Sequence, residues 1–332
     1  MSDVLNALAI GVKAGLGFQA IFYCLLAVGL NVHFGYVGLL NFGQIAFAMF
    51  GGFGIAISVS QWGLPFWVGV LIGLAASVVL ALLLGLPTLR LRADYLAIVT
   101  IATAEGLRLL FRSVSATPIT NGTRGLSGFN GDFIALAPWD TQRRYDLIGT
   151  SWSGGELWVA LVGWILVALT SLLVWQLMRS PWGRVLKAIR EDEDAVRALG
   201  KNVYSYKMQA LVLGGLFGAL GGMIYTLGTG AANPDNFNNA NTFLAYAALI
   251  LGGAARVLGP VVGSIILLFI LQFADTFLRA LISNGVIPDA LLSSTDVAQI
   301  RFVLVGIGLM LLLVFRPQGI FGDRREVMLD AR

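Results

Sequence analysis

AGLGFQAIFYCLLAVGL (residues 14–30) begins an apolar run that ends with LIGLAASVVLALLLGLPTL (residues 71–89). The whole run, residues 14–89, contains no Asp, Glu, Lys or Arg. A helix needs about 20 apolar residues to cross a bilayer, so this run alone predicts three crossings joined by two tight turns. The strands of a membrane β-barrel alternate apolar and polar residues and leave no run of this kind. Because helices satisfy their own backbone polar groups in lipid, we expect an all-α bundle.

The composition of the whole chain predicts an integral membrane protein. Of its 332 residues, 57% are hydrophobic and 12% are charged, and the mean hydropathy is +0.82, whereas a soluble domain carries about 25% charged residues. The net charge of +4 is what basic residues left at membrane edges produce, so we expect a lipid bilayer and no nucleic acid as partner.

Signatures of catalysis and of metal binding are absent from the sequence. There is no P-loop, no H-E-x-x-H, no nucleophile elbow and no cluster of Cys and His. The single Cys24 cannot form an intramolecular disulfide, and together with the single His33 it cannot build a metal site. We therefore expect a transport protein that is not an enzyme and needs no cofactor.

The distribution of Lys and Arg predicts the topology. Basic residues that flank a span are retained on the cytoplasmic side, and the clusters at 90–92, 179–207, 256 and 316–332 share one side if the chain crosses about nine times, in a range of about eight to ten. We expect a single transmembrane domain, residues 1–332, with its N-terminus outside and its C-terminus inside. The expected spans are 17–33, 37–60, 65–86, 95–111, 157–178, 208–228, 242–255, 259–277 and 302–315.

Two long connections interrupt the spans. Residues 112–156 carry balanced charge and are expected outside, as a periplasmic loop. Residues 179–207 hold seven basic side chains and are expected inside. This second loop has helix signals: Ser180 at the cap position, Pro181 in the first turn, and an apolar face that Asp192 would interrupt. We expect two short helices with a break at 191–193 and an end at Gly200, forming a docking element; the alternative is a solvated connector. The apolar face consists of Leu186, Ile189, Val196 and Leu199.

Polar side chains inside the apolar spans are costly and mark contacts between helices or a wet path. The candidates for a translocation path are Asn31, Asn41, Gln44, Thr100 and Glu105. For Asn41 and Gln44 a packing role fits equally well, and Glu105 can form a structural pair with Arg108 three residues later on the same helix face.

Two further features of the spans point to packing. His33, at a helix end, is expected to be a hydrogen-bonded structural residue. Gly214, Gly218 and Gly222 recur every four residues and predict a ridge for close helix contact.

Three classes of transporter remain: an ion-coupled carrier, a channel, and a permease driven by a separate ATPase. An ion-coupled carrier needs ionisable residues deep in its spans, and this chain offers there only Glu105 and the peripheral Asp275. A permease that is driven from outside needs no such residues, but it needs a structured cytoplasmic element for its motor. The 179–207 loop provides that element.

Five stretches, in this order, carry a resemblance to a known family. The chain resembles, over nearly its whole length, the LivM-type permease subunits of branched-chain amino acid ABC importers. The stretches are GYVGLLNFGQ (35–44), LRLRADYLAIVT (89–100), GRVLKAIREDEDAVRALG (183–200), LGG (251–253) with Gly259-Pro260, and FRPQG (315–319).

This resemblance implies a type II ABC importer fold and several partners. These are a second, related permease subunit, two cytoplasmic ATP-binding subunits and a periplasmic amino-acid-binding protein. It implies that residues 183–200 are the coupling element in a groove of the ATPase. The coupling residues are then Gly183, Arg184, Arg190, Glu191, Asp194, Ala195 and Gly200.

The implied substrates are branched-chain or related amino acids, and the alternatives are a permease for urea or short amides and an ion-coupled carrier. The chain departs from its relatives at TNGTRG (120–125) and at LGGAARVLGP (251–260). Both regions can touch substrate or partner, so these departures leave the substrate open.

Overall fold

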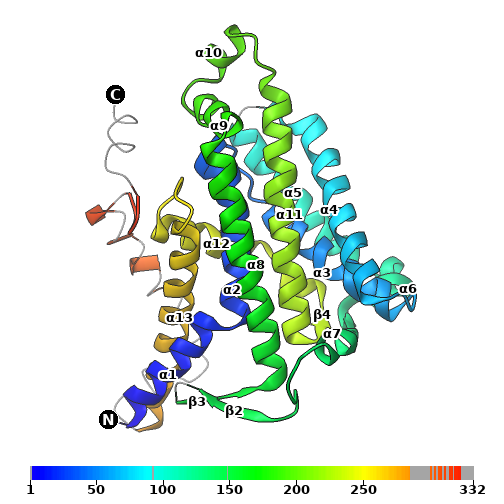
Figure 1. The fold of residues 1–332 in the computed structure, drawn as a ribbon, viewed down its shortest axis with the longest axis vertical. Coiled ribbons are helices and arrows are strands. Elements are labelled where there is room, and N and C mark those ends of the chain that lie inside the picture. The colour runs from blue at the N-terminus through cyan, green and yellow to red at the C-terminus, as the bar shows by residue number, and fades with distance from the viewer. Residues whose placement is uncertain are drawn as a thin grey trace.

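The computed structural model describes residues 2–91, 93–147 and 149–284, with residues 300, 303, 306–308, 310, 311, 314–316 and 318–322 of the C-terminal part. Within these residues the expected helical bundle is confirmed (Figure 1). Arg92, Arg301, Pro317, part of the expected span 302–315 and the tail after residue 322 lie outside the described residues.

Helices account for most of the described chain. The helices are α1 Ser2–Leu16, α2 Phe18–Leu30, a π-helix Asn31–Val37, α3 Gln44–Ser60, α4 Phe66–Thr88, α5 Ala93–Arg112, α6 Thr117–Thr120, α7 Gly131–Ala135, α8 Gly154–Arg179, α9 Pro181–Glu191, α10 Glu193–Ala198, α11 Val203–Thr229, α12 Asn239–Gly252 and α13 Gly259–Ser283, with 3-10 turns at Val114–Ala116, Gly122–Arg124 and Pro234–Phe237.

Two helices form the centre of the bundle. In α2 with its π-helix, 89% of the most apolar part is buried. The corresponding buried share is 72% in α11 but 33% in α8 and in α13. α11 packs on α3, α2 and α4, and α13 packs on α1 and α12. The outer helices thus direct uncharged apolar side chains outward, as a helix in contact with lipid requires.

Close contact at the centre depends on glycine. A Cβ added at Gly222 of α11 would lie 1.8 Å from the carbonyl oxygen of Ala48 in α3, and one added at Gly214 would lie 2.6 Å from the carbonyl oxygen of Gly29 in α2. The expected ridge of Gly214, Gly218 and Gly222 is confirmed: small residues allow the helix backbones to approach closely.

Among the described residues, five helices are long and apolar enough to cross a membrane: α2 with the π-helix, α4, α8, α11 and α13. α3 has 17 residues, α12 has 14, and α5 carries four charged residues, so these three expected spans do not meet that standard. The count of about nine crossings stays a prediction.

The structure contains elements that the sequence did not predict. α1 is a helix of 15 residues where only a short N-terminal segment was expected. Two antiparallel pairs of strands complete the described part: β1 Leu126–Ser127 with β4 Ala231–Ala232, and β2 Arg144–Leu147 with β3 Thr150–Ser153. α9 and α10 lie at one end of the bundle, and β2, β3 and α7 lie at the other (Figure 1).

Candidate functional site: a charged helical corner and an uncharged pocket

The segment between α8 and α11 consists of the two expected short helices. α9 ends at Glu191, and Asp192 has extended backbone angles. The Asp192 carboxylate accepts hydrogen bonds from the backbone N–H groups of Asp194 and Ala195, at 2.9 and 3.0 Å, and thereby caps α10. Gly200 follows with φ at +77°, a conformation that glycine adopts without strain. The predicted break and end are therefore confirmed.

Two details of this segment correct the sequence analysis. The Ser180 hydroxyl donates to the carbonyl of Leu177 at 2.6 Å and does not cap α9. Leu186, Ile189 and Val196 are buried as expected, but Leu199 is 80% exposed, because α10 has already ended at Ala198.

The seven candidate coupling residues divide into two groups. One group is exposed at the end of the bundle: Arg184, Glu191, Asp194, Ala195 and Gly200. The other two contact the bundle itself. Gly183 is buried at the corner between α8 and α9, where an added Cβ would lie 2.5 Å from the Cα of Met178. The half-buried Arg190 donates from Nη1 to the carbonyl oxygen of Gly35 at 2.6 Å.

The Arg190 contact joins α9 to the π-helix that continues α2. From the same π-helix, Asn31 accepts from the backbone N–H of Ala255 and donates to the carbonyl of Arg256, both at 2.8 Å. Residues 254–256 belong to the turn between α12 and α13. The π-helix therefore links the exposed corner to a turn far away in the sequence.

The C-terminal motif adds a further contact to this turn. The backbone N–H groups of Ile320 and Phe321 donate to the carbonyls of Leu251 and Gly252 at the end of α12, each at 3.0 Å. The last carbonyls of a helix have no partner within it, so this segment satisfies two of them. The two residues that follow the stretch 315–319 are thus bonded to the stretch 251–253.

The candidate path residues Asn41, Gln44 and Thr100 lie around the nonhelical segment between the π-helix and α3. Asn41 donates to Nδ1 of His33 at 3.2 Å and to the Gln44 side chain at 3.3 Å, and the Gln44 amide donates to the carbonyl of Gly214 at 2.8 Å. Thr100 accepts from the backbone N–H of Phe42 at 3.1 Å. All three side chains are buried, and these bonds hold residues 41–44 against α5 and α11.

His33 is bonded at both ring nitrogens. Because the Asn41 amide donates to Nδ1, the proton is on Nε2, which donates to the carbonyl of Leu211 at 3.2 Å. The expectation of a structural histidine is confirmed.

Glu105, the remaining path candidate, forms the expected pair with Arg108, whose Nη2 lies 2.5 Å from Oε1 of Glu105. The structure adds Asp235, whose Oδ1 lies 2.6 Å from Nη1 of Arg108. A single guanidinium therefore joins α5 to the turn before α12.

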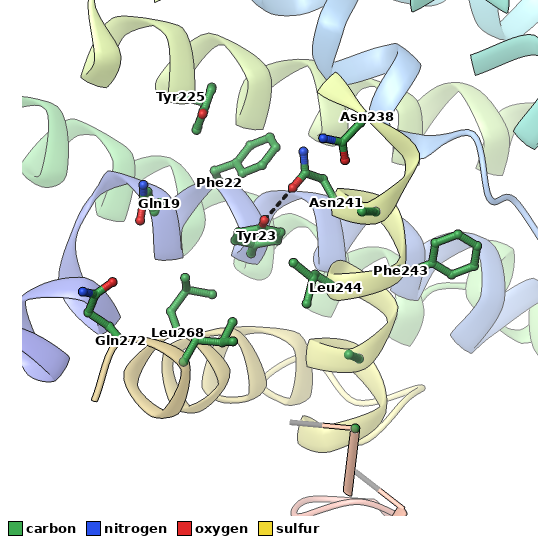
Figure 2. A pocket seen from close by; sticks show the side chains of 14 residues that line it. Gln19, Phe22, Tyr23, Tyr225, Asn238, Asn241, Phe243, Leu244, Leu268 and Gln272 are labelled. Carbon is green, nitrogen blue, oxygen red and sulfur yellow. Dashed lines mark hydrogen bonds between the residues drawn. The ribbon is translucent and has the colours of Figure 1, made fainter. Parts of the chain in front are cut away.

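A pocket of about 650 Å³ at the other end of the bundle was missed by the sequence analysis (Figure 2). Its wall includes four carboxamide side chains, and they come from α2, the residue before α12, α12 itself and α13. Like Asn41, each is a carboxamide next to an apolar residue in the sequence. Because they are far apart along the chain, the sequence does not show that they lie close together in the fold. They are Gln19, Asn238, Asn241 and Gln272.

Comparisons with known proteins identify the family. The family model described as the branched-chain amino acid transport system / permease component matches residues 14–315. The chain belongs to this family.

Three relatives carry names that match the family description. The high-affinity branched-chain amino acid transport system permease protein LivM of Escherichia coli is 30% identical over 90% of this chain and 67% of that protein. Its counterpart from Salmonella typhimurium is 29% identical over the same shares. The probable branched-chain amino acid transport permease protein LivM of Methanocaldococcus jannaschii is 23% identical over 91% of both chains.

Membership of this family makes the chain a multi-pass membrane permease subunit that works with other subunits. In this permease the charged corner lies at one end of the bundle (Figure 1), and the pocket lies between α2, α12 and α13.

Proposed function

We propose that this chain is a permease subunit of an ATP-driven importer for branched-chain amino acids. In this proposal it forms the translocation path with a second, related permease subunit, and it works with two cytoplasmic ATP-binding subunits and a periplasmic amino-acid-binding protein. The observation that carries the proposal is the α9–α10 corner, a structured element that exposes five candidate coupling residues and joins the core through Arg190.

The orientation follows from the positive-inside rule. The proposal treats the chain as one transmembrane domain in the plasma (inner) membrane, with residues 179–207 as the cytoplasmic coupling loop and residues 112–156 as the periplasmic loop. The N-terminus is then outside and the C-terminus inside. The location of α9–α10 opposite β2 and β3 supports this assignment (Figure 1).

The proposed mechanism is a two-state switch. Closure of the ATPase pair pushes on the α9–α10 corner, and Arg190 carries the movement to the π-helix through the Gly35 carbonyl. Asn31 carries it on to the α12–α13 turn. π-helical segments are frequent at functional sites, and here one continues α2. Packed helices that have two arrangements convert a small push into a tilt of the bundle.

The composition of the core supports an external motor. Among the described residues, the one charged side chain that is buried is Asp275, and Arg279 pairs with it at 2.9 Å. An ion-coupled carrier would need ionisable groups in the path itself. Asn31, Asn41, Gln44, Thr100 and Glu105 remain candidates for the path in this proposal, and their hydrogen bonds support a role in shaping its wall.

The test is to purify the tagged chain from its native membrane and identify the proteins that accompany it. The proposal expects two nucleotide-binding subunits and a second permease subunit. Uptake of radiolabelled leucine by the reconstituted complex should need ATP and the binding protein, and isoleucine and valine should compete whereas urea should not. A complex without nucleotide-binding subunits, or competition by urea alone, would contradict it.

A further inference from the structure

The pocket at the end opposite α9–α10 has a consistent position in every element that lines it. Gln19 is in the first turn of α2, Asn241 is in the first turn of α12, and Gln272 is in the second half of α13. Since α2 and α12 run toward α9 and α13 runs away from it (Figure 1), all three side chains belong to the half of the bundle that the proposed orientation places outside.

The hydrogen bonding in the pocket is incomplete. Tyr23 donates to the Asn241 side chain at 2.7 Å, and the Asn241 amide donates to the carbonyl of Asn236 at 2.7 Å. Gln19 and Gln272, in contrast, have no hydrogen bond to any other residue that the structure describes. Gln19 is exposed and Gln272 is half-buried, so both carboxamides keep their donors and acceptors available, although polar groups in membrane helices usually bond to a neighbouring helix.

Among the described residues that line the pocket, no side chain is charged, and apart from the hydroxyls of Tyr23 and Tyr225 the rest of the wall is apolar. The Lys13–Glu156 ion pair lies in a neighbouring pocket that Gln19 and Gln272 also line. In Figure 2, Phe22 and Tyr23 lie between Gln19 and Asn241, and Leu268 lies between Gln272 and Leu244. The pocket therefore offers neutral donors and acceptors around an aliphatic surface. A carboxamide can accept from an ammonium group and donate to a carboxylate, so this arrangement fits a zwitterion with an aliphatic side chain.

We propose that this pocket is the outer solute subsite of the permease, which takes a zwitterionic amino acid with an aliphatic side chain through Gln19 and Gln272. The inference rests on the proposed function and deepens it. The cavity is larger than one such solute, so water enters with the solute and binding is weak. Weak binding suits a path, because a solute that binds tightly does not leave.

The experiment uses cysteine labelling of the complete transporter in proteoliposomes. Cys24 is the one cysteine of the sequence and is buried, so the unmodified chain is the unreactive control. Gln272→Cys and Gln19→Cys are treated from outside with a charged methanethiosulfonate. Leu83→Cys, on the exposed face of α4, is the matched control for a position that faces lipid.

We expect the charged reagent to modify Gln272→Cys and Gln19→Cys but not Leu83→Cys, and leucine with its binding protein to slow that modification several-fold. Three results would overturn the proposal. If only a membrane-soluble maleimide reacts, the pocket contains lipid. If the cysteines react in the isolated chain but not in the complex, another subunit covers the pocket. The third result is a modification rate that leucine does not change.

Kinetics separate this subsite from a structural role. Gln272→Leu should raise the KM for leucine uptake several-fold with little change in kcat, because the transport cycle is intact and one solute contact is lost. Gln272→Asn, which keeps a carboxamide, should recover part of the loss. A fall in kcat with no change in KM would contradict the assignment. Failure of the proposed function would differ, since the unmodified complex would then show no ATP-driven leucine uptake.

Discussion

The two ends of the bundle are built from different chemistry. At the α9–α10 corner, charged side chains are numerous and several are paired: Arg197 contacts Glu193 and Asp194 at 2.9 and 2.8 Å, and Lys207 pairs with Glu193. At the pocket, the polar groups are neutral carboxamides, and two of them are unpaired within the described residues. In the proposed mechanism this difference has a reason: a corner that transmits force needs fixed contacts, whereas a pocket that passes a solute needs polar groups that remain available.

The largest effect should come from a change at the junction of the corner and the bundle. Gly183→Leu places a side chain where a Cβ alone would lie 2.5 Å from the Cα of Met178. Overpacking of this kind costs about 3 kcal/mol, so α9 should leave its position and ATP-driven uptake should be lost. Uptake and the yield of assembled complex are the measurements.

Gly131→Leu is the matched control, since nothing lies within 4 Å of a Cβ added there. Normal uptake by Gly183→Leu would show that the position of α9 does not matter for transport.

Arg190 and Arg184 separate transmission from docking. Arg190→Ala removes the bond to the Gly35 carbonyl, and a hydrogen bond to a charged group contributes about 1.5–3 kcal/mol. We expect the ATPases to remain bound while the leucine transported per ATP hydrolysed falls about tenfold or more. Arg184→Ala, which alters an exposed side chain, should instead weaken ATPase association.

Two quantities are measured on the same reconstituted preparations: the leucine transported per ATP hydrolysed, and the amount of ATPase bound to the permease. Equal loss of association in both variants would remove the distinction between the two groups of coupling residues.

Asn31 tests whether a path candidate acts through its bonds. Asn31→Leu removes the hydrogen bonds to the Ala255 N–H and the Arg256 carbonyl, and an unsatisfied polar group in the interior costs about 1–3 kcal/mol. The melting temperature in detergent should fall together with uptake. A variant that keeps its melting temperature but loses uptake would favour direct contact of Asn31 with the solute over the structural link.

Local signals in the sequence predicted much of the corner. Asp192 interrupts an apolar face and caps the following helix, so the break at 191–193 could be predicted from neighbouring residues alone. The errors lie at helix ends. Ser180 has a closer acceptor in the Leu177 carbonyl, and Leu199 falls just beyond α10. Each depends on where a helix stops, which local pattern fixes least well.

Distant contacts could not be predicted. The π-helix contains Asn31, whose partners are more than 200 residues away, and the pocket joins side chains from α2, α12 and α13. The sequence did identify Asn31, Asn41 and Gln44 as polar residues in apolar surroundings. It could not show which neighbours would satisfy them, because tertiary packing decides that.

The smallest effect is expected at the surface of the corner. Arg197→Ala removes two ion pairs, but the Arg197 side chain is 61% exposed, and exposed pairs contribute at most about 1 kcal/mol. The melting temperature should change little, and less than for Lys207→Ala, because the Lys207 side chain is 12% exposed. The reverse order would show that the exposed face of α10 is held more firmly than its contact with α11.

The central claim is that this permease has no energy source of its own and moves because partners act on the α9–α10 corner. Leucine uptake by proteoliposomes that contain the complete complex tests it most directly, with ATP supplied and ion gradients collapsed by ionophores, and with gradients imposed but ATP withheld. The account predicts full uptake in the first condition and none in the second. Uptake that follows the gradient and ignores ATP would contradict it.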